Sequence, residues 1–193
     1  MINKTIILII FGLFTINCAK NDEQIFNSTE YIEVYDNSEN LLEKNRSIYY
    51  GQFLLTGKVI KKIGEQIVSI KEYKDGKLHG IEITYYLNGN VKEERYYENG
   101  FKTGEHRGWW ESGNIKYIYH FKNDVFNGNI KVWNETGMLF NDLNYVNGYE
   151  DGLQKAWMIN GEIQANYFVK GNRKYGITGV KDCKTEIPQI SRK

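Results

Sequence analysis

The sequence has few residues that crosslink or kink a chain, and it has little net charge. It contains one proline and two cysteines among 193 residues, and its 25 basic and 24 acidic side chains nearly cancel. A nucleic-acid binder usually carries a clear basic excess, so we expect no nucleic-acid partner. Nineteen glycines and fifteen tyrosines contrast with the single proline, and this mixture favours strands and tight turns.

Long apolar runs are also missing. The apolar stretch at residues 5–14 follows Lys4 and is too short to span a bilayer, but it has the length of a secretory signal core. The segment TINC at residues 15–18 resembles a bacterial lipobox, in which the cysteine is acylated and becomes the mature N-terminus. We therefore predict a lipoprotein signal peptide at residues 1–17 and lipidation at Cys18. Thr15 and Asn17 depart from the usual leucine and small residue, which leaves plain secretion as the alternative.

The residues after Cys18 indicate where in the cell the protein is located. The segment AKNDE at residues 19–23 resembles the export signal of some Bacteroidota lipoproteins, and a charged, solvated tether is the other reading. We expect a lipid anchor in the outer membrane, on its periplasmic side or on the cell surface. Removal of residues 1–17 takes away Lys4 and no acidic residue, which leaves a mature chain without net charge.

Cysteine is too scarce for a disulfide framework. If Cys18 is acylated, Cys183 is the only remaining thiol, so no intramolecular disulfide can form. A lone thiol could be reactive or bind a soft metal, but the simpler expectation is a small buried residue near the end of the fold.

Self-similarity at a spacing of 24 residues is the main feature that is present. Two glycine rows and one aromatic row keep this spacing, and a further aromatic row runs through residues 73, 97, 121 and 145. The first glycine row is Gly80, Gly104, Gly128, Gly152 and Gly176; the second is Gly89, Gly113, Gly137 and Gly161; the aromatic row is Tyr85, Trp109, Trp133 and Trp157. An irregular copy precedes them from Gly57, and the last copy is expected to slip by one residue at Phe168 and Gly171. Irregular terminal copies are typical of the caps of a repeat array.

Each unit reads as a β-hairpin. Strand-prone runs at residues 81–86 and 91–97 flank the pair Asn88-Gly89, and the return turns carry pairs such as Asn99-Gly100. Asp124 replaces the glycine in one return turn, where aspartate tolerates left-handed backbone better than most residues. We predict an all-β fold with a tether and N-terminal cap at residues 18–45, repeats at 46–180 and a tail at 181–193.

A two-residue hairpin loop would fix which side chains share a face. It would place Trp110 opposite Ile115 and direct both to the same side as the alternate residues Tyr117, Tyr119 and Phe121. The opposite face would carry the aromatic row. Lysines would interleave with that row, at Lys92, Lys116, Lys131 and Lys155. Such a row is usually structural, but it is also the candidate interaction surface of this chain.

These residues carry a resemblance to a known family. The segments YKDGKLHG at residues 73–80 and WWESGNIK at residues 109–116 are similar to the bacterial variant of the MORN repeat. Over residues 50–176 the chain resembles YwqK-family antitoxins. That resemblance implies an elongated antiparallel β-meander and the binding and neutralising of a toxin; an exported immunity protein would reconcile this role with lipidation.

No pattern of residues indicates catalysis, a cofactor or a metal site. Under the expected register His106 and His120 point to opposite faces, and His79 lies in a return turn as a polar turn residue. We therefore expect a non-enzymatic membrane-anchored lipoprotein that binds a protein partner through its sheet. The alternative is a module that binds cell-surface glycans or small ligands through its aromatic rows, although the lysines would repel a cation such as choline.

Overall fold

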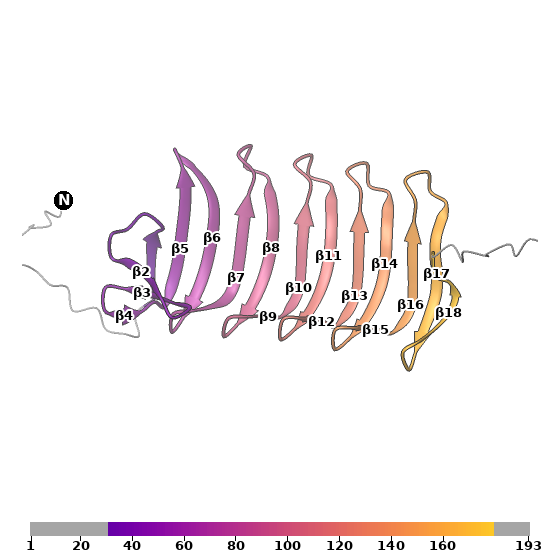
Figure 1. The fold of residues 1–193 in the computed structure, drawn as a ribbon. Helices are drawn as coiled ribbons and strands as arrows, with labels where there is room; N and C mark the ends of the chain where they lie inside the picture. The colour runs from indigo at the N-terminus through magenta and orange to yellow at the C-terminus, as the bar shows by residue number, and fades with distance from the viewer. Residues whose placement is uncertain (1–30, 180–193) are drawn as a thin grey trace, which may run out of the picture.

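The computed structural model describes residues 31–179, which form 18 β-strands and no helix (Figure 1). The strands are β1 Ile32–Tyr35, β2 Leu41–Lys44, β3 Ser47–Tyr50, β4 Phe53–Leu54, β5 Gly57–Ile63, β6 Gln66–Lys74, β7 Lys77–Tyr85, β8 Val91–Glu98, β9 Phe101–Lys102, β10 Gly104–Trp109, β11 Ile115–Lys122, β12 Val125–Phe126, β13 Gly128–Trp133, β14 Leu139–Val146, β15 Tyr149–Glu150, β16 Gly152–Trp157, β17 Ile163–Lys170 and β18 Arg173–Ile177.

One long sheet accounts for 15 of these strands. From β5 to β18 its long strands follow one another in sequence order, each antiparallel to the next, so the predicted elongated meander of hairpins is confirmed. The short strands β9, β12 and β15 lie off this path and pair with β8, β11 and β14. β1 caps the N-terminal edge by pairing in parallel with β5, and β2, β3 and β4 form a separate small sheet.

The hairpins use two kinds of turn. Each return turn has a two-residue loop in which both residues have positive φ, as at Asn99 (52°) and Gly100 (89°). Asp124 adopts φ 67° at the position of that glycine, which confirms the expected left-handed aspartate. From the β7–β8 hairpin onward the opposite turns have three-residue loops in which only the glycine has positive φ, as at Gly113 (91°). Trp110 N donates to Asn114 O across that loop. In the first hairpin Ile63 pairs with Gln66, so this turn has a two-residue loop.

The third loop residue overturns the expected pairing of Trp110 with Ile115. Ile115 lies opposite Trp109, and a bulge at Lys116 then places Tyr117 opposite Gly108. Ile115 and Trp109 therefore share one face, whereas Tyr117 and the residues alternate with it occupy the other. The same bulge recurs in the hairpins on either side.

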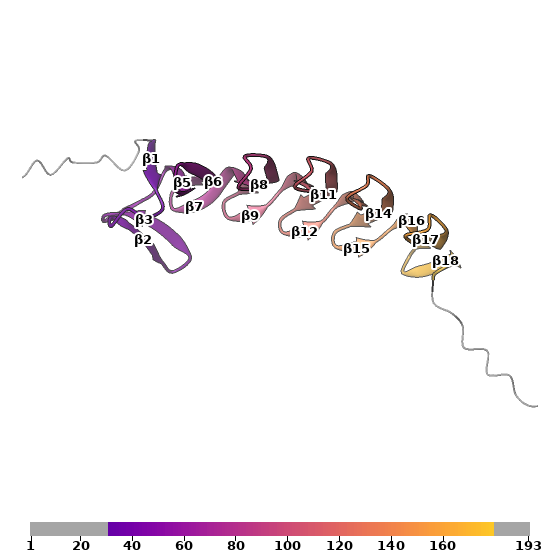
Figure 2. The same ribbon diagram turned by 90° about the horizontal axis from the view of Figure 1, so that it is seen from above.

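The short strands fold over one face of the sheet, which we call the inner face. Phe126 of β12 packs against Phe121 at a ring-centroid distance of 4.7 Å and against Tyr119 at 5.6 Å. Figure 2 shows the result from above: β9, β12 and β15 lie to one side of the long strands, on the side that faces the reader in Figure 1. The opposite face, which carries Trp109 and Ile115, is the outer face.

Cross-strand pairing on the inner face explains two of the sequence rows. Gly80 lies opposite Tyr97, Gly104 opposite Phe121, and Gly128 opposite Tyr145. Each of these glycines has positive φ, between 69° and 127°, so it bends the strand where the return turn joins it. The first glycine row and the aromatic row at residues 97, 121 and 145 therefore pair with each other across neighbouring strands.

The sequence predicts a shift of one residue in the last copy, but its strands keep the register of the other copies. Val169 lies opposite Gly152, where the other copies have an aromatic residue, and Phe168 belongs to the outer face. The return turn of this copy has Gly171 and Asn172, in the reverse order of the pair Asn147-Gly148, 24 residues earlier. The last copy therefore has different residue types at these positions, and its strand is not shifted.

Neighbouring repeats are tied together at the turns. Tyr86 Oη donates to Trp109 O at 2.9 Å, and Trp110 Nε1 makes the equivalent bond to Trp133 O at 3.2 Å in the next copy. At the opposite edge Gly100 N donates to Leu78 O at 2.7 Å, and further copies repeat this bond. These contacts give each hairpin partners only in the adjacent copies, as expected for a solenoid-like array.

Clusters of buried apolar side chains lie at the two ends of the array. Val34, Leu55 and Val59 form a cluster beneath the N-terminal cap, and Ala165, Tyr167 and Val169 form one in the last hairpin. The predicted boundary at residue 45 falls in the turn between β2 and β3.

Candidate functional site

The predicted aromatic row lies on the outer face, where all four rings are half-buried. Each ring stands opposite an aliphatic residue of its own hairpin: Tyr85 opposite Val91, Trp109 opposite Ile115, Trp133 opposite Leu139 and Trp157 opposite Ile163. Such aromatic–aliphatic pairs stabilise a hairpin by up to about 1 kcal/mol each. The rows thus form one apolar band that runs from repeat to repeat.

The rings of this band keep their exposed surfaces free of other rings and of cations. Within residues 31–179 none of the four stacks on another ring or lies beneath a lysine or arginine. Neighbouring hairpins are two strands apart, so successive rings lie about 10 Å from one another, which is too far for stacking. The band is a row of separate, partly exposed rings.

The expected interleaving of lysines with the aromatic row is only partly found. Lys116 Nζ lies 4.3 Å from the ring centroid of Trp110, and Lys92 Nζ lies 5.6 Å from that of Tyr86. The bulge in each hairpin directs these two lysines to the rings next to the row and not to the row itself. Lys131 remains beside the row and pairs with Asp142 at 3.6 Å.

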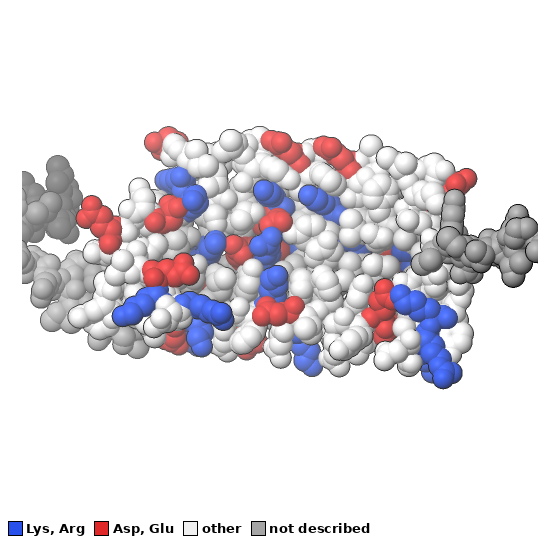
Figure 3. All heavy atoms as spheres, viewed as in Figure 1, with Lys and Arg blue, Asp and Glu red and all other residues white. Residues whose placement is uncertain are grey.

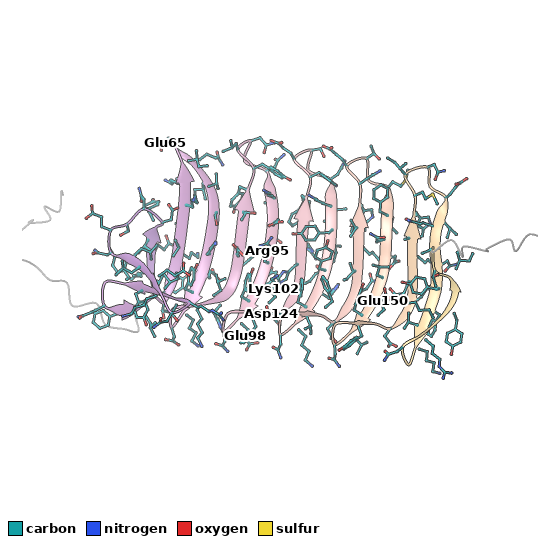
Figure 4. All side chains as sticks on the ribbon, in the orientation of Figure 1. Glu65, Arg95, Glu98, Lys102, Asp124 and Glu150 are labelled. Carbon is teal, nitrogen blue, oxygen red and sulfur yellow. The ribbon has the colours of Figure 1, made fainter. Side chains whose placement is uncertain are left out.

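The inner face carries a network of charges that the sequence reading missed. Lys71 Nζ lies 3.3 Å from one oxygen of Glu82, and Arg95 lies 3.8 Å from the other oxygen and 2.5 Å from Glu93. Two tyrosines complete it: Tyr97 Oη donates to Glu82 and Tyr117 Oη donates to Glu93. Figure 3 shows the acidic and basic side chains intermixed over the N-terminal half of this face, and Figure 4 labels Arg95 among them.

These tyrosines are held in their neutral form. Burial, followed by the nearby Glu82 carboxylate, raises the pKa of Tyr97 to about 12. Burial and the Glu93 carboxylate raise the pKa of Tyr117 further above its usual value. Both hydroxyls therefore act as hydrogen-bond donors to carboxylates at any ordinary pH.

One buried position shows how the chemistry changes along the inner face. At intervals of 24 residues it holds Glu82, His106, Ile130 and Gln154, which are exposed by only 6%, 2%, 4% and 0%. Gln154 bonds both the N–H and the C=O of Asn144, ten residues earlier in the preceding long strand. His106 Nε2 lies 3.2 Å from Tyr96 N and 2.9 Å from Tyr96 O, and its tautomer decides whether this nitrogen accepts from the N–H or donates to the C=O. Gln154 and His106 thus bond backbone groups of the preceding strand beyond the last ladder pairs, whereas Glu82 pairs with side chains and Ile130 is apolar.

Among the described residues no group of histidine, cysteine and acidic side chains could hold a metal ion. His106 lies opposite Tyr119 and His120 opposite Glu105, so the two imidazoles occupy opposite faces as the sequence predicted. His79 lies within strand β7 and not in the return turn that the sequence predicted for it, and its Nδ1 accepts from Asn99 N, in the following return turn, at 3.4 Å. No helix long and apolar enough to cross a bilayer occurs within residues 31–179.

The predicted lipidation site Cys18 and the second thiol, Cys183, lie outside the described residues. The glycines of the second predicted row, Gly89, Gly113, Gly137 and Gly161, all have positive φ between 85° and 91°, as their place in the loops requires. In the first row Gly152 and Gly176 also have positive φ, 83° and 119°.

Comparison with known proteins bears on the repeats. A search of the curated proteins finds no match to the chain. A family model of the MORN repeat variant matches residues 78–99 and 102–123. These two adjacent stretches span the β7–β8 hairpin and the β10–β11 hairpin in the middle of the array. The chain is thus a repeat β-sheet protein that contains MORN repeats of the variant type.

Proposed function

We propose that this chain is a non-enzymatic, lipid-anchored binding protein whose repeat sheet holds a protein partner. The observation that carries the proposal is the outer-face band, in which three tryptophans and a tyrosine repeat and each is partly exposed. Aromatic side chains, above all tryptophan, tyrosine and arginine, supply most of the binding energy in protein interfaces. A band of several rings offers a rigid partner several anchor points at once.

The C-terminal edge of the sheet adds to this surface. All five residues of β18 are exposed, and within the described residues β18 pairs only with β17. An edge strand can accept an extended segment of another protein by backbone hydrogen bonding. The outer-face neighbours Leu153, Phe168 and Tyr175 leave 42%, 46% and 56% of their surfaces exposed beside this edge. A partner can therefore contact the apolar band and the edge together.

Capture of the partner tests the proposal. The epitope-tagged full chain would be purified from its native membranes, with the proteins that accompany it identified by mass spectrometry. A parallel preparation would carry Trp109→Ala, Trp133→Ala and Trp157→Ala. We expect one stoichiometric protein with the native chain and its loss with the triple variant. Retention of that protein by the variant would show that the outer-face band is not its binding site.

The anchor is proposed at Cys18, on the membrane side of a tether that precedes β1. Acyl chains contribute about 0.8 kcal/mol for each buried methylene, so more than one chain gives stable attachment. Metabolic labelling with a palmitate analogue should mark the native chain and not Cys18→Ala. Protease treatment of intact cells would then distinguish the cell surface from the periplasmic side of the outer membrane. Labelling of Cys18→Ala would place the lipid elsewhere.

The role we propose for the captured partner is that of a toxin, which the chain would neutralise as an exported immunity protein. Cells that lack the chain should then be sensitive to the partner, and expression of the native chain should restore resistance. The triple tryptophan variant should fail to restore it. Equal growth of all three strains in the presence of the partner would exclude the immunity role and leave a scaffold.

A second candidate function is the binding of a glycan or another small ligand by the same band. The rings of the band are partly exposed and contact neither cations nor one another within the described residues. This arrangement favours glycan binding, because a sugar ring stacks on an open aromatic face. Saturable binding of an oligosaccharide that quenches tryptophan fluorescence, together with no captured protein, would support this function over the first.

A further inference from the structure

The N-terminal cap overhangs a cavity on the inner face. The turn between β2 and β3 lies over the return turns of the first repeats, and the space between them has a volume of about 660 Å³. This volume falls within the usual range of small-ligand pockets, about 300–1,000 Å³. Its apolar walls include Ile48, Leu78 and Phe101. The cavity is separate from the outer-face band.

The backbone of the overhanging turn is strained at one residue. Asn45 and Arg46 occupy a two-residue loop and have φ values of 54° and 61°. The return turns have glycine, aspartate or asparagine at the position of Arg46, as at Gly76, Asp124 and Asn172. Left-handed backbone is unfavourable for a long side chain, and such outliers gather at functional sites. Arg46 makes no ion pair within residues 31–179, so no salt bridge described there offsets the cost of this backbone conformation.

Three polar side chains around the cavity lack an ion pair or a side-chain hydrogen bond within the described part of the chain, and two of them, Glu43 and Lys77, are exposed. Lys77 makes no ion pair there, and Glu43 makes neither a salt bridge nor a side-chain hydrogen bond. Tyr73 is the equivalent of Tyr97, but its hydroxyl lacks the carboxylate that Tyr97 contacts. Burial, Glu82 and Glu43 raise the pKa of Tyr73 to about 12, so the hydroxyl is a neutral donor.

The charges that line the cavity are of both signs. Lys71 is already paired with Glu82, which leaves Arg46 and Lys77 as uncompensated cations. Glu43 and Asp124 are the anions; Asp124 uses one oxygen to accept from Lys102 N at 2.7 Å and has the other free. Figure 4 labels Asp124 beside Lys102 at the lower edge of the sheet. Two cations and two anions complement a ligand that carries one charge of each sign.

We propose that this cavity binds a short peptide with free ends, whose carboxylate lies at Arg46 and Lys77 and whose ammonium group lies at Glu43 and Asp124. The apolar walls accept its side chains. Charge complementarity selects this ligand, because a purely anionic molecule would be repelled by the carboxylates and a purely cationic one by Arg46 and Lys77. The site does not depend on the proposed protein partner.

The test is calorimetric titration of the purified full chain with trialanine, with its N-acetylated form and with its C-terminal amide. We expect trialanine to bind with a dissociation constant of about 1 mM or lower, and each blocked form to bind at least about tenfold more weakly. In the double variant Arg46→Gln with Lys77→Gln, trialanine and its amide should bind equally. In Glu43→Gln with Asp124→Asn, trialanine and its acetylated form should bind equally.

Two further variants separate binding from folding. Lys170→Gln removes an exposed lysine far along the array and should leave trialanine binding unchanged. Arg46→Gly relieves the strained backbone, so the melting temperature should rise while trialanine affinity falls. Undetectable binding of trialanine at millimolar concentration, equal binding of its blocked forms by the native chain, or full affinity in Arg46→Gly would overturn the proposal.

Discussion

Gly108 offers the sharpest test of the inner-face packing. It lies opposite Tyr117 and has ordinary strand backbone, so only space keeps a side chain out. A Cβ placed on Gly108 would lie 2.5 Å from Cζ of the Tyr117 ring, well inside van der Waals contact. The ring cannot turn away freely because its hydroxyl donates to Glu93 at 2.9 Å. We therefore expect Gly108→Val to destabilise the array.

The magnitude follows from two opposing terms. Overpacking of a filled site costs about 1–3 kcal/mol, whereas replacing glycine in a strand recovers about 0.5–1 kcal/mol of backbone entropy. The net loss for Gly108→Val is then about 1–2 kcal/mol. A chain of this size should lose about 2–4 °C in melting temperature for each kcal/mol, measured by thermal unfolding followed by circular dichroism.

The next repeat supplies a matched rescue. Its equivalent pair is Val132 and Asn141, which lie opposite each other in the same register. The double variant Gly108→Val with Tyr117→Asn rebuilds this pair, so its loss should be smaller than the sum of the two single losses. A melting temperature for Gly108→Val equal to or above that of the native chain would refute the contact between residue 108 and the Tyr117 ring.

Three further predictions concern buried polar groups and loop glycines. Burial lowers the pKa of His106, so below about pH 6.5 the unfolded chain binds more protons than the folded one and stability should decrease as the pH is lowered. His106→Gln, which places the residue of position 154 here, should make the melting temperature less dependent on pH between about pH 7.5 and pH 5, and an unchanged dependence would contradict this. The hydroxyls of Ser69 and Thr84 are buried without a hydrogen-bond partner among residues 31–179, so Ser69→Ala with Thr84→Val should unfold at the same or a higher urea concentration, and a clear decrease would show that at least one hydroxyl is hydrogen-bonded. Gly113→Val should lower stability by more than about 1 kcal/mol in the same assay, since a β-branched residue resists φ 91°, and an unaltered midpoint would argue against the loop geometry.

The 24-residue period was enough to predict the hairpins, the position of each turn and the glycine and aromatic rows. It could not give the loop length, because Ser112-Gly113 fits either a two-residue loop or the end of a three-residue loop. The difference of one residue in loop length decides whether Ile115 shares a face with Trp109 or with Tyr117. Face assignments in a sheet reverse with a shift of one residue, so the error was confined to the side chains next to the loop.

The inner-face chemistry was hidden for a different reason. Glu82, His106 and Gln154 occupy a buried position, yet none of them is apolar, so a hydrophobic pattern does not reveal them. Their spacing of 24 residues is a signal that could have shown their equivalence. The cavity beneath the cap depends on contacts between β2–β3 and later turns, and Arg46 gives no sign in the sequence of its left-handed backbone.

The central claim is that the outer-face band holds a protein partner. The most direct test is the affinity of the captured partner for the purified native chain, for the Trp109, Trp133 and Trp157 triple alanine variant, and for an inner-face control, Tyr119→Phe, which keeps the buried ring. The account predicts a loss of at least about a hundredfold in the triple variant, since hot-spot residues contribute about 2 kcal/mol or more each, and no change in the control. Native affinity in a folded triple variant would contradict it.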